Sequence, residues 1–206
     1  MSFTLKRGLS NVYIAEVTKD TEEAYTTGTP EHLIPAGEMG KTVDADKALF
    51  WFDNTVFATV GREGATEITI SGAGLRAAAR AKINGKTIDE QTGAVVDAGE
   101  FVEKYYALGA ETENIDGTKE YFWFMKGTFA IPEENDKTKG EDTDANGTSL
   151  TYSAIPTTHK FASTKKTCKR VVIDTETTKL QDAAEWTEQV VTPDNLATIC
   201  AAVSAG

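Results

Sequence analysis

The sequence predicts a mainly β fold of the α+β class, a β-sandwich with one flanking α-helix and long polar loops. Two β-rich runs, residues 119–132 and 147–156, are separated by a polar span. The first run is so dense in aromatic side chains that it is typical of a strand buried on both faces. Before the C-terminal region, residues 75–83 form the only convincing helical pattern. Many strands against one helix indicate a β-dominated domain.

The aromatic run is expected to be the central strand of the sheet, and residues 148–155 its return strand. Apolar and polar residues alternate along the return strand, as they do in a strand with one buried face. The residues expected in the core are Phe122, Trp123, Phe124, Phe129, Leu150 and Tyr152. The span between the two runs is too polar for core and too long for a tight hairpin. Because loops of this length are usually functional or disordered, we expect a flexible projecting arm here.

Ahead of this pair, residues 10–19 are predicted to form a short opening strand, followed by a polar loop over 20–30. Residues 38–70 are interpreted as a long hairpin or extended loop, with turns at Asp53-Asn54 and at Gly61–Gly64 and a further strand at 67–70.

The helix over 75–83 is alanine-rich and should stop at Asn84-Gly85. Next, a turn at 91–93 separates short apolar pairs, and residues 102–111 indicate another strand. Beyond Pro156 we expect a strand at 170–174, a weak helical patch at 183–186 and a tail from 193. The predicted domain organisation is one β-sandwich domain over 1–165. Residues 166–206 should add a strand and an extension that packs on the same domain or on a neighbouring copy.

Composition excludes some function classes. With 206 residues and 40% hydrophobic content, one sizeable domain is expected. The net charge of −11 argues against a general nucleic-acid binder, which needs a basic surface. No apolar run follows Lys6 and Arg7 and none reaches the roughly 20 residues of a membrane span, so we expect a soluble protein made in the cytoplasm. Cys168 and Cys200 lack metal-ligand spacing and are expected to be free thiols.

Residues 72–77, with Asp89 seventeen residues after Gly72, outline a dinucleotide-binding fingerprint. A Rossmann domain needs several parallel βαβ units, whereas this chain has hairpins and almost no helix. The favoured interpretation is therefore a glycine-rich turn entering a surface helix, and no cofactor is expected.

Asp142, Asp144 and Asn146 match the first half of a calcium loop. The closing position would be Ser153 rather than glutamate, so an Asx-rich turn is the favoured interpretation and a calcium site the alternative.

Titratable residues do not form a catalytic pattern. His32 and His159 stand apart from any cysteine or carboxylate at ligand spacing, and no metal site or His-based triad is expected. The paired acids at 22–23 and 133–134 are interpreted as solvated charge. Five basic residues within 160–170 either meet an acidic patch on a neighbouring copy or form a solvated loop. Catalysis is not expected.

A pattern spread along the chain resembles the major tail proteins of long non-contractile-tailed bacteriophages. It comprises residues 8–15, the segment 48–54 with the glycine turn and strand that follow, residues 105–108, the aromatic run 121–129, the polar arm and residues 147–152. The likeness covers roughly 8–161 and, more loosely, 184–193. The resemblance depends on the order and spacing of these segments rather than on any one of them. The tail at 191–206 departs from the shorter members of the family.

The resemblance implies six copies closing into a ring whose inner sheets make a continuous β-barrel, with rings stacking into a tail tube. Such a tube lies in the virion tail, is assembled in the host cytoplasm and conducts DNA without specific binding. An acidic wall suits that passage because it repels phosphates. The implied partners are further copies of the chain, a tape-measure protein, and terminator and baseplate or distal tail proteins, with no membrane.

If the resemblance holds, the polar segments 39–64 and 132–147 are ordered by contacts between copies. The contact residues expected on this basis are Asp53, Asn54, Arg62, Glu63, Glu133, Glu134, Asp136, Lys137 and Lys139. A related contractile-tail or secretion tube would share the fold. The alternative from another class is a β-sandwich module that binds carbohydrate or mediates calcium-dependent adhesion, and an enzyme is the third interpretation.

Overall fold

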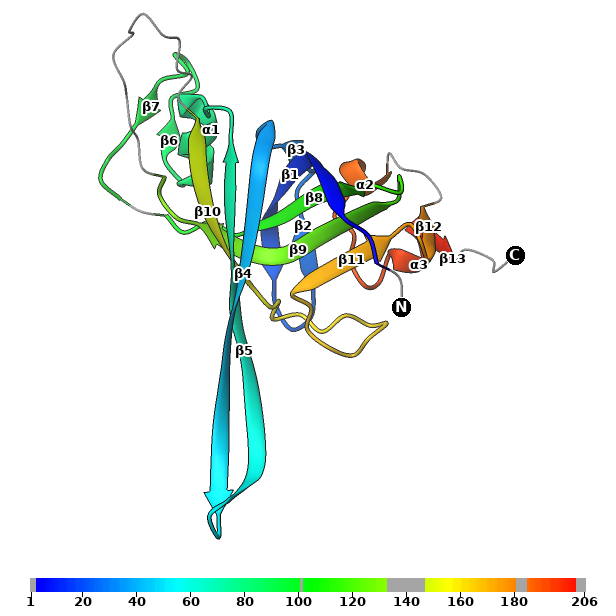
Figure 1. Cartoon of the computed structure of the whole chain (residues 1–206). Helices are drawn as coiled ribbons and strands as arrows, with labels where there is room; N and C mark the ends of the chain where they lie inside the picture. The colour runs from blue at the N-terminus through cyan, green and yellow to red at the C-terminus, as the bar shows by residue number, and fades with distance from the viewer. Residues whose placement is uncertain (1–2, 101, 133–146, 181–184, 203–206) are drawn as a thin grey trace, which may run out of the picture.

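The computed structural model describes residues 3–100, 102–132, 147–180 and 185–202 (Figure 1). The mainly β prediction is confirmed, since one large antiparallel sheet contains nine of the strands. In chain order the elements are β1 (Lys6–Asp20), β2 (Tyr25–Thr27), β3 (Glu31–His32), β4 (Ala36–Phe52), β5 (Thr55–Gly72), α1 (Ala77–Ile83), β6 (Thr87–Ile88), β7 (Val95–Val96), β8 (Tyr106–Asn114), β9 (Lys119–Phe129), β10 (Thr148–Ile155), β11 (Arg170–Asp174), β12 (Thr178–Leu180), α2 (Glu185–Glu188), α3 (Leu196–Ile199) and β13 (Cys200–Ala202).

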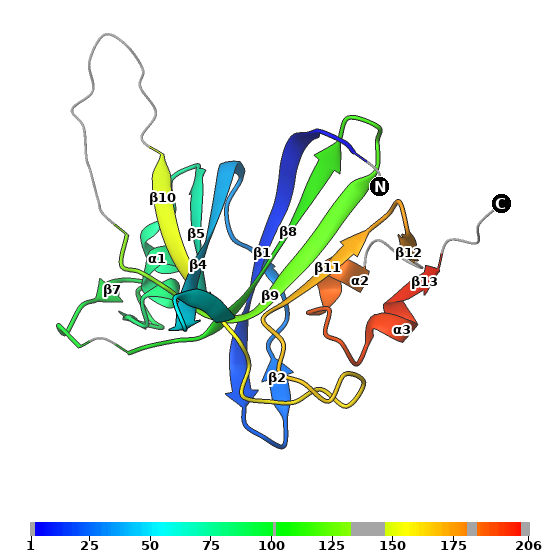
Figure 2. The same cartoon turned by 60° about the horizontal axis from the view of Figure 1, so that its bottom comes forward.

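The sheet changes direction at β9, which exchanges partners along its length. β8 pairs with one side of β9. On the other side, β11 pairs with residues 120–124 and β10 with residues 126–129. The result is two halves, β1–β8–β9–β11 and β10–β5–β4, that face each other as in a β-sandwich (Figure 2).

β9 is buried on both faces because a cluster of apolar side chains lies on each side of it. Phe122 and Phe124 belong to the cluster between the two halves of the sheet. Trp123 and Met125 point the other way, into a second cluster that includes Trp186 of α2. The rings of Trp123 and Trp186 lie 5.6 Å apart. The C-terminal segment thus covers the outer face of the strand.

All six residues expected in the core are buried, with exposed fractions of 4% or less. In β10 the buried positions alternate with more exposed ones, and Leu150 and Tyr152 face the inner cluster. The packing is tight enough to require a glycine opposite Trp123. A Cβ atom on Gly109 would lie 2.7 Å from the indole ring.

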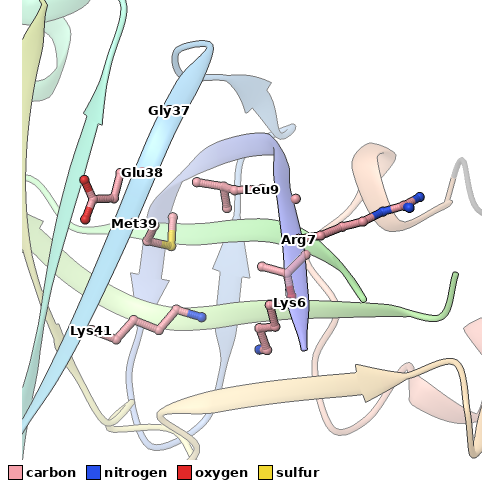
Figure 3. A pocket seen from close by; sticks show the side chains of 9 residues that line it. Lys6, Arg7, Leu9, Gly37, Glu38, Met39 and Lys41 are labelled. Carbon is pink, nitrogen blue, oxygen red and sulfur yellow. The ribbon is translucent and has the colours of Figure 1, made fainter. Parts of the chain in front are cut away.

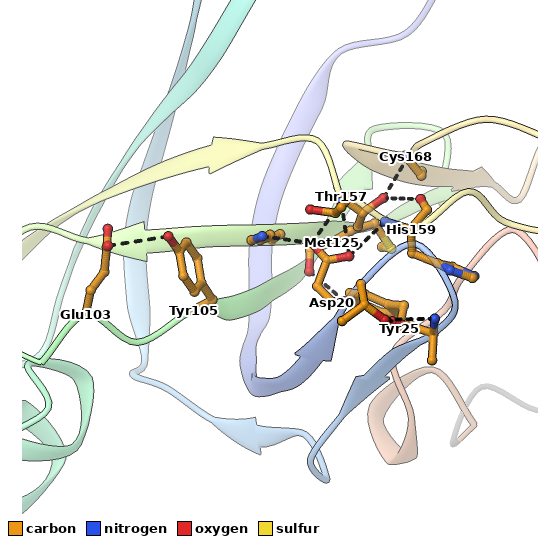
Figure 4. A network of polar contacts seen from close by, with 12 residues as sticks. Asp20, Tyr25, Glu103, Tyr105, Met125, Thr157, His159 and Cys168 are labelled. Atoms are coloured by element: carbon orange, nitrogen blue, oxygen red, sulfur yellow. Dashed lines mark hydrogen bonds and ion pairs between the residues drawn. The ribbon is translucent and has the colours of Figure 1, made fainter.

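A buried carboxylate joins the end of β1 to β9 and to the segment after β10 (Figure 4). Asp20 accepts hydrogen bonds from Nζ of Lys126 at 2.8 Å and from the backbone N–H groups of Thr158 at 2.8 Å and His159 at 2.9 Å. Its side chain is 3% exposed. Burial alone would raise the pKa of Asp20, but these hydrogen bonds and the charge of Lys126 outweigh it and hold the pKa below its usual value.

Several sequence-based boundaries are wrong. Residues 25–27 of the expected loop form β2, because they find ladder partners on β1. Residues 61–64 do not turn but lie within β5, whose pairing with β4 shifts register next to Gly64. The strand expected at 67–70 is therefore the last part of this longer strand. β8 begins at Tyr106 rather than at 102. The expected tail contains α3 and β13, and β13 pairs with β12, which the local pattern did not reveal.

Candidate assembly interface

The most prominent feature of the molecule is a two-stranded arm that projects from the sandwich (Figure 1). β10 pairs with β5 only from Thr66 onward. Residues 44–64, here called the distal arm, therefore have no third strand beside them among the described residues. At 3.3–3.4 Å per residue the arm extends about 30 Å beyond the body. A two-stranded hairpin of this kind is marginally stable by itself in water.

Turn chemistry explains why the chain reverses at the tip of the arm. Asp53 and Asn54 both have positive φ, 50° and 60°. Two-residue hairpin loops favour this geometry because its twist matches that of the strands, and Asp and Asn tolerate it better than other non-glycine residues. The hydroxyl of Thr55 donates to the carbonyl of Phe52 at 3.0 Å and closes the turn. The turn expected at this pair of residues is confirmed.

The distal arm is apolar where a solvent-exposed hairpin is normally polar. Seven large apolar side chains on it are 45–76% exposed: Leu49, Phe50, Trp51, Phe52, Val56, Phe57 and Val60. Phe52 and Phe57 pack edge to face, with ring centroids 5.3 Å apart. The segment is predicted to be polar, and this is correct near its base, where Asp44, Asp46 and Glu63 lie, and at the turn itself, but not along the strands between.

Apolar side chains occupy both faces of the distal arm. Side chains alternate along a strand, so Phe50 and Phe52 of β4 share one face while Leu49 and Trp51 share the other. Neither face meets the sandwich core, because the clusters of the core include no residue of the arm. Contiguous exposed apolar surface of this kind marks a site of protein association. The distal arm is therefore the best candidate interface in the described part of the chain.

The sheet also has open edges. Within the described residues, β4 pairs only with β5, β11 only with β9 and β2 only with β1. Their free N–H and C=O groups are a template for pairing with another chain. Edge pairing is thus a second way in which copies could associate.

Two neighbouring cavities open between β4 and the β1–β8–β9–β11 half. One, of 390 Å³, is bordered by Lys6, Leu9, Met39 and Lys41 (Figure 3). The other, of 410 Å³, lies between Lys41 and the segment 167–170. Figure 3 shows Lys41 reaching from β4 toward Lys6, whereas Arg7 points away. Lys41 borders both cavities, and the two are considered together below.

The sequence-predicted contact residues fall into two groups. Asp53, Asn54, Arg62 and Glu63 lie on the distal arm, and Glu63 forms an ion pair with Lys169 of the same chain. The other five, at positions 133, 134, 136, 137 and 139, lie outside the described residues, as do the calcium candidates Asp142, Asp144 and Asn146. The exposed aromatic residues of the arm were missing from the prediction, although the segment 48–54 had been noted.

The dinucleotide interpretation finds no support in the geometry. β5 and its neighbours are antiparallel, and a Cβ atom on Gly72 would lie 2.5 Å from the carbonyl oxygen of Pro35. The glycine is therefore needed for close packing of the chain. The carboxylate of Asp89 accepts hydrogen bonds from the backbone N–H and hydroxyl of Thr92 within its own turn.

The histidines and cysteines considered as candidate functional residues have no catalytic arrangement in the described part of the chain. A ring nitrogen of His159 lies 3.1 Å from the carbonyl oxygen of Glu22, and His32 packs edge to face on Tyr13. Cys168 and Cys200 are free thiols, and burial raises the pKa of both. In the described ranges, no group of three or more His, Cys, Asp or Glu residues is placed to hold a metal ion. No helix in those ranges is long and apolar enough to span a membrane.

Comparison with protein families gave one match, in which the family described as phage tail tube protein matches residues 43–185. The match begins within β4 and ends at the start of α2, so it includes the whole distal arm beyond residue 43 and covers more than half of the chain. Comparison with curated proteins found no match.

Proposed function

The chain belongs to the phage tail tube protein family, a structural family of the virion tail, and from this premise we propose that it forms the tube by stacking rings of identical copies. Membership implies self-assembly into a tube. The proposal adds that the rings contain six copies, that their inner sheets make a continuous barrel, and that DNA passes through the lumen into the host.

The observation that carries this proposal is the exposed aromatic tip of the distal arm. Trp51 is 59% exposed and Phe57 is 76% exposed. Burying a large apolar side chain stabilises an assembly by about 1.5–3 kcal/mol relative to leaving it in water. An arm with several such residues on both faces therefore has a strong tendency to pack against protein. In a homo-oligomer the protein available to cover it is another copy.

The shape of the molecule favours contacts that propagate. The tip lies far from the sandwich, and α1 lies at the opposite end of the molecule (Figure 1). A contact between different surfaces of two copies is heterologous, so it gives rings when the rotation closes and open stacks when it does not. We propose that edge pairing closes the ring and that the distal arm links one ring to the next.

Charge supports the proposed passage of DNA. The net charge is −11, so the chain repels phosphates rather than binding them. Assembly in the host cytoplasm, a tape-measure protein inside the growing tube, and terminator and baseplate or distal tail proteins at its ends complete the proposal. The family match does not support the alternative of a carbohydrate- or calcium-binding module.

The experiment compares wild type with the double variant Phe52→Ser, Phe57→Ser. Removing the aromatic tip should raise the concentration needed for assembly by about tenfold or more, since each lost apolar contact is worth more than the 1.4 kcal/mol of a tenfold change. Negative-stain electron microscopy and sedimentation velocity over a concentration series measure this.

The matched control is Val96→Ser, Ile115→Ser, which removes two exposed apolar side chains outside the arm. It should assemble like wild type. Wild-type protein that stays monomeric at millimolar concentration, or tip variants that form tubes at the wild-type concentration, would contradict the proposal.

A further inference from the structure

The groove between β4 and β11 is cationic in an acidic protein. We define the Lys41 groove by Lys6, Met39, Lys41, Val43, Lys169 and Arg170. Glu38 and Glu63 also border its two cavities, so cations outnumber carboxylates there. Its floor is β9, where Phe122 and Phe124 are each 1% exposed. Nζ of Lys41 lies 3.3 Å from the ring centroid of Phe122, and the guanidinium carbon of Arg170 lies 5.6 Å from that of Phe124.

Two of the four cations already have carboxylate partners. Lys6 pairs with Glu120 at 2.9 Å, and Lys169 pairs with Glu63. Lys41 and Arg170 form no ion pair with any carboxylate in the described ranges, and each lies against an aromatic ring. The charges of Glu120 and Glu63 act on Lys41 and Arg170 respectively, but only beyond ion-pair distance. A cation removed from water is stabilised best by an anion that also accepts its hydrogen bonds. The groove therefore has two cations available to an incoming carboxylate.

Electrostatics within the groove supports this interpretation. Burial lowers the pKa of Lys41 to about 8, and the nearby charges of Lys6 and Arg170 act in the same direction while Glu120 opposes them. An added carboxylate would offset the repulsion among these cations and favour the charged form of Lys41.

We propose that the Lys41 groove is a docking site for the acidic segment 133–146 of a second copy of this chain. This segment contains six carboxylates and two lysines, so its charge is opposite to that of the groove. The opposite charges of the segment and the groove favour docking at this site, whereas the acidic surface elsewhere on the chain repels the segment. The inference rests on the proposed function because it takes a second copy of the chain as the partner. It also gives a binding role to basic residues near Arg170, for which the sequence analysis left two interpretations open.

The first test measures binding of a fluorescent peptide with the sequence of residues 132–147. The receptor is the full chain in which the six carboxylates of 133–146 are changed to amides, so that its own segment does not compete. The peptide should bind this receptor, and binding should weaken as salt rises because the contact is ionic. Adding Lys41→Glu and Arg170→Glu should weaken binding by about tenfold or more.

The matched control is Lys19→Glu, Lys179→Glu, which makes the same change in charge on exposed lysines away from the groove. It should bind the peptide as the receptor does. Binding should also fall as pH rises from 7 to 9, because Lys41 loses its proton, and Lys41→Arg should remove most of that fall. Equal binding by the groove variant and the control, or tighter binding of duplex DNA than of the peptide, would overturn the proposal.

A second test asks whether docking occurs between copies. The amide-substituted chain keeps its groove, and the Lys41→Glu, Arg170→Glu chain keeps its acidic segment. At concentrations below the one at which wild type forms tubes, each alone should remain monomeric, whereas an equimolar mixture should form 1:1 dimers in sedimentation velocity. A mixture that stays monomeric overturns docking between copies. Peptide binding without any tube formation would support this inference and contradict the proposed function. Tubes formed by the groove variant would support the proposed function and contradict this inference.

Discussion

The tripeptide Phe-Trp-Phe occurs twice in this chain, and its two copies have opposite environments. In β9, Phe122, Trp123 and Phe124 are 1% exposed or less. In β4, Phe50, Trp51 and Phe52 are 47–60% exposed. Both copies lie in strands, so the local conformation is the same. The difference is in the neighbours. Residues 122–124 of β9 pair with β8 on one side and with β11 on the other, whereas the structure describes no strand beside the distal arm except its own hairpin partner.

The comparison teaches that one local pattern serves two different kinds of packing. The β9 copy stabilises the fold of a single chain. The β4 copy adds nothing to that core, and its apolar surface is available to stabilise an assembly. The following predictions separate the two regions, in order of decreasing effect on the stability of the monomer.

The largest effect is expected for Trp123→Ala, which leaves a cavity against Trp186 in a buried cluster. The free energy of unfolding should fall by about 3–5 kcal/mol. Trp51→Ala, the same change in the arm, should alter it by less than about 0.5 kcal/mol because the side chain is in solvent. Urea unfolding followed by tryptophan fluorescence and circular dichroism measures both. Equal losses for the two variants would show that the arm is part of the monomer core.

A smaller loss is expected for Asp20→Asn, which removes the charge that compensates Lys126, a side chain only 14% exposed. At pH 7 the free energy of unfolding should fall by about 1.5–3 kcal/mol. The pKa of Asp20 is lower in the folded chain than in the unfolded one. Its stabilisation is therefore present above the unfolded value near pH 4 and is lost as pH falls toward the folded value.

The difference in the free energy of unfolding between wild type and Asp20→Asn should accordingly become smaller below pH 4. In the arm, Glu63→Gln removes an exposed partner of Lys169 and should leave the melting temperature unchanged. Calorimetry at pH 7 and pH 3 distinguishes the two cases, and a difference at pH 3 as large as that at pH 7 would count against the ionic role of Asp20.

The smallest effects are expected for two glycine substitutions, one in the core and one in the distal arm. Gly109→Ala should destabilise the monomer by about 1–3 kcal/mol, since the added methyl group meets the Trp123 ring at 2.7 Å and the packing must shift. Gly61→Ala, in the distal arm, meets nothing within 4 Å and should be neutral or slightly stabilising. Thermal unfolding by circular dichroism measures both, and a large loss at Gly61 would indicate packing around the arm in the monomer.

The pattern of residues alone was sufficient for the β-dominated fold, the helix before Asn84, the central aromatic strand and the turn at Asp53-Asn54. These features are local: side-chain alternation, helix propensity and tolerance of positive φ act within a few residues. Asp53 and Asn54 reverse the chain because their own conformational preferences permit it.

Contacts between distant segments decided the rest. The continuation of β5 through Gly61 and Gly64, the partner exchange along β9 and the pairing of β12 with β13 depend on strands elsewhere in the chain. The same is true of the Lys41 groove, whose cations come from β1, β4, the segment before β11 and the first residue of β11. Above all, the sequence alone predicted a strand at the second Phe-Trp-Phe copy and a long hairpin or extended loop at the first. Only the tertiary structure decided which one is buried, because burial depends on whether other strands lie beside it.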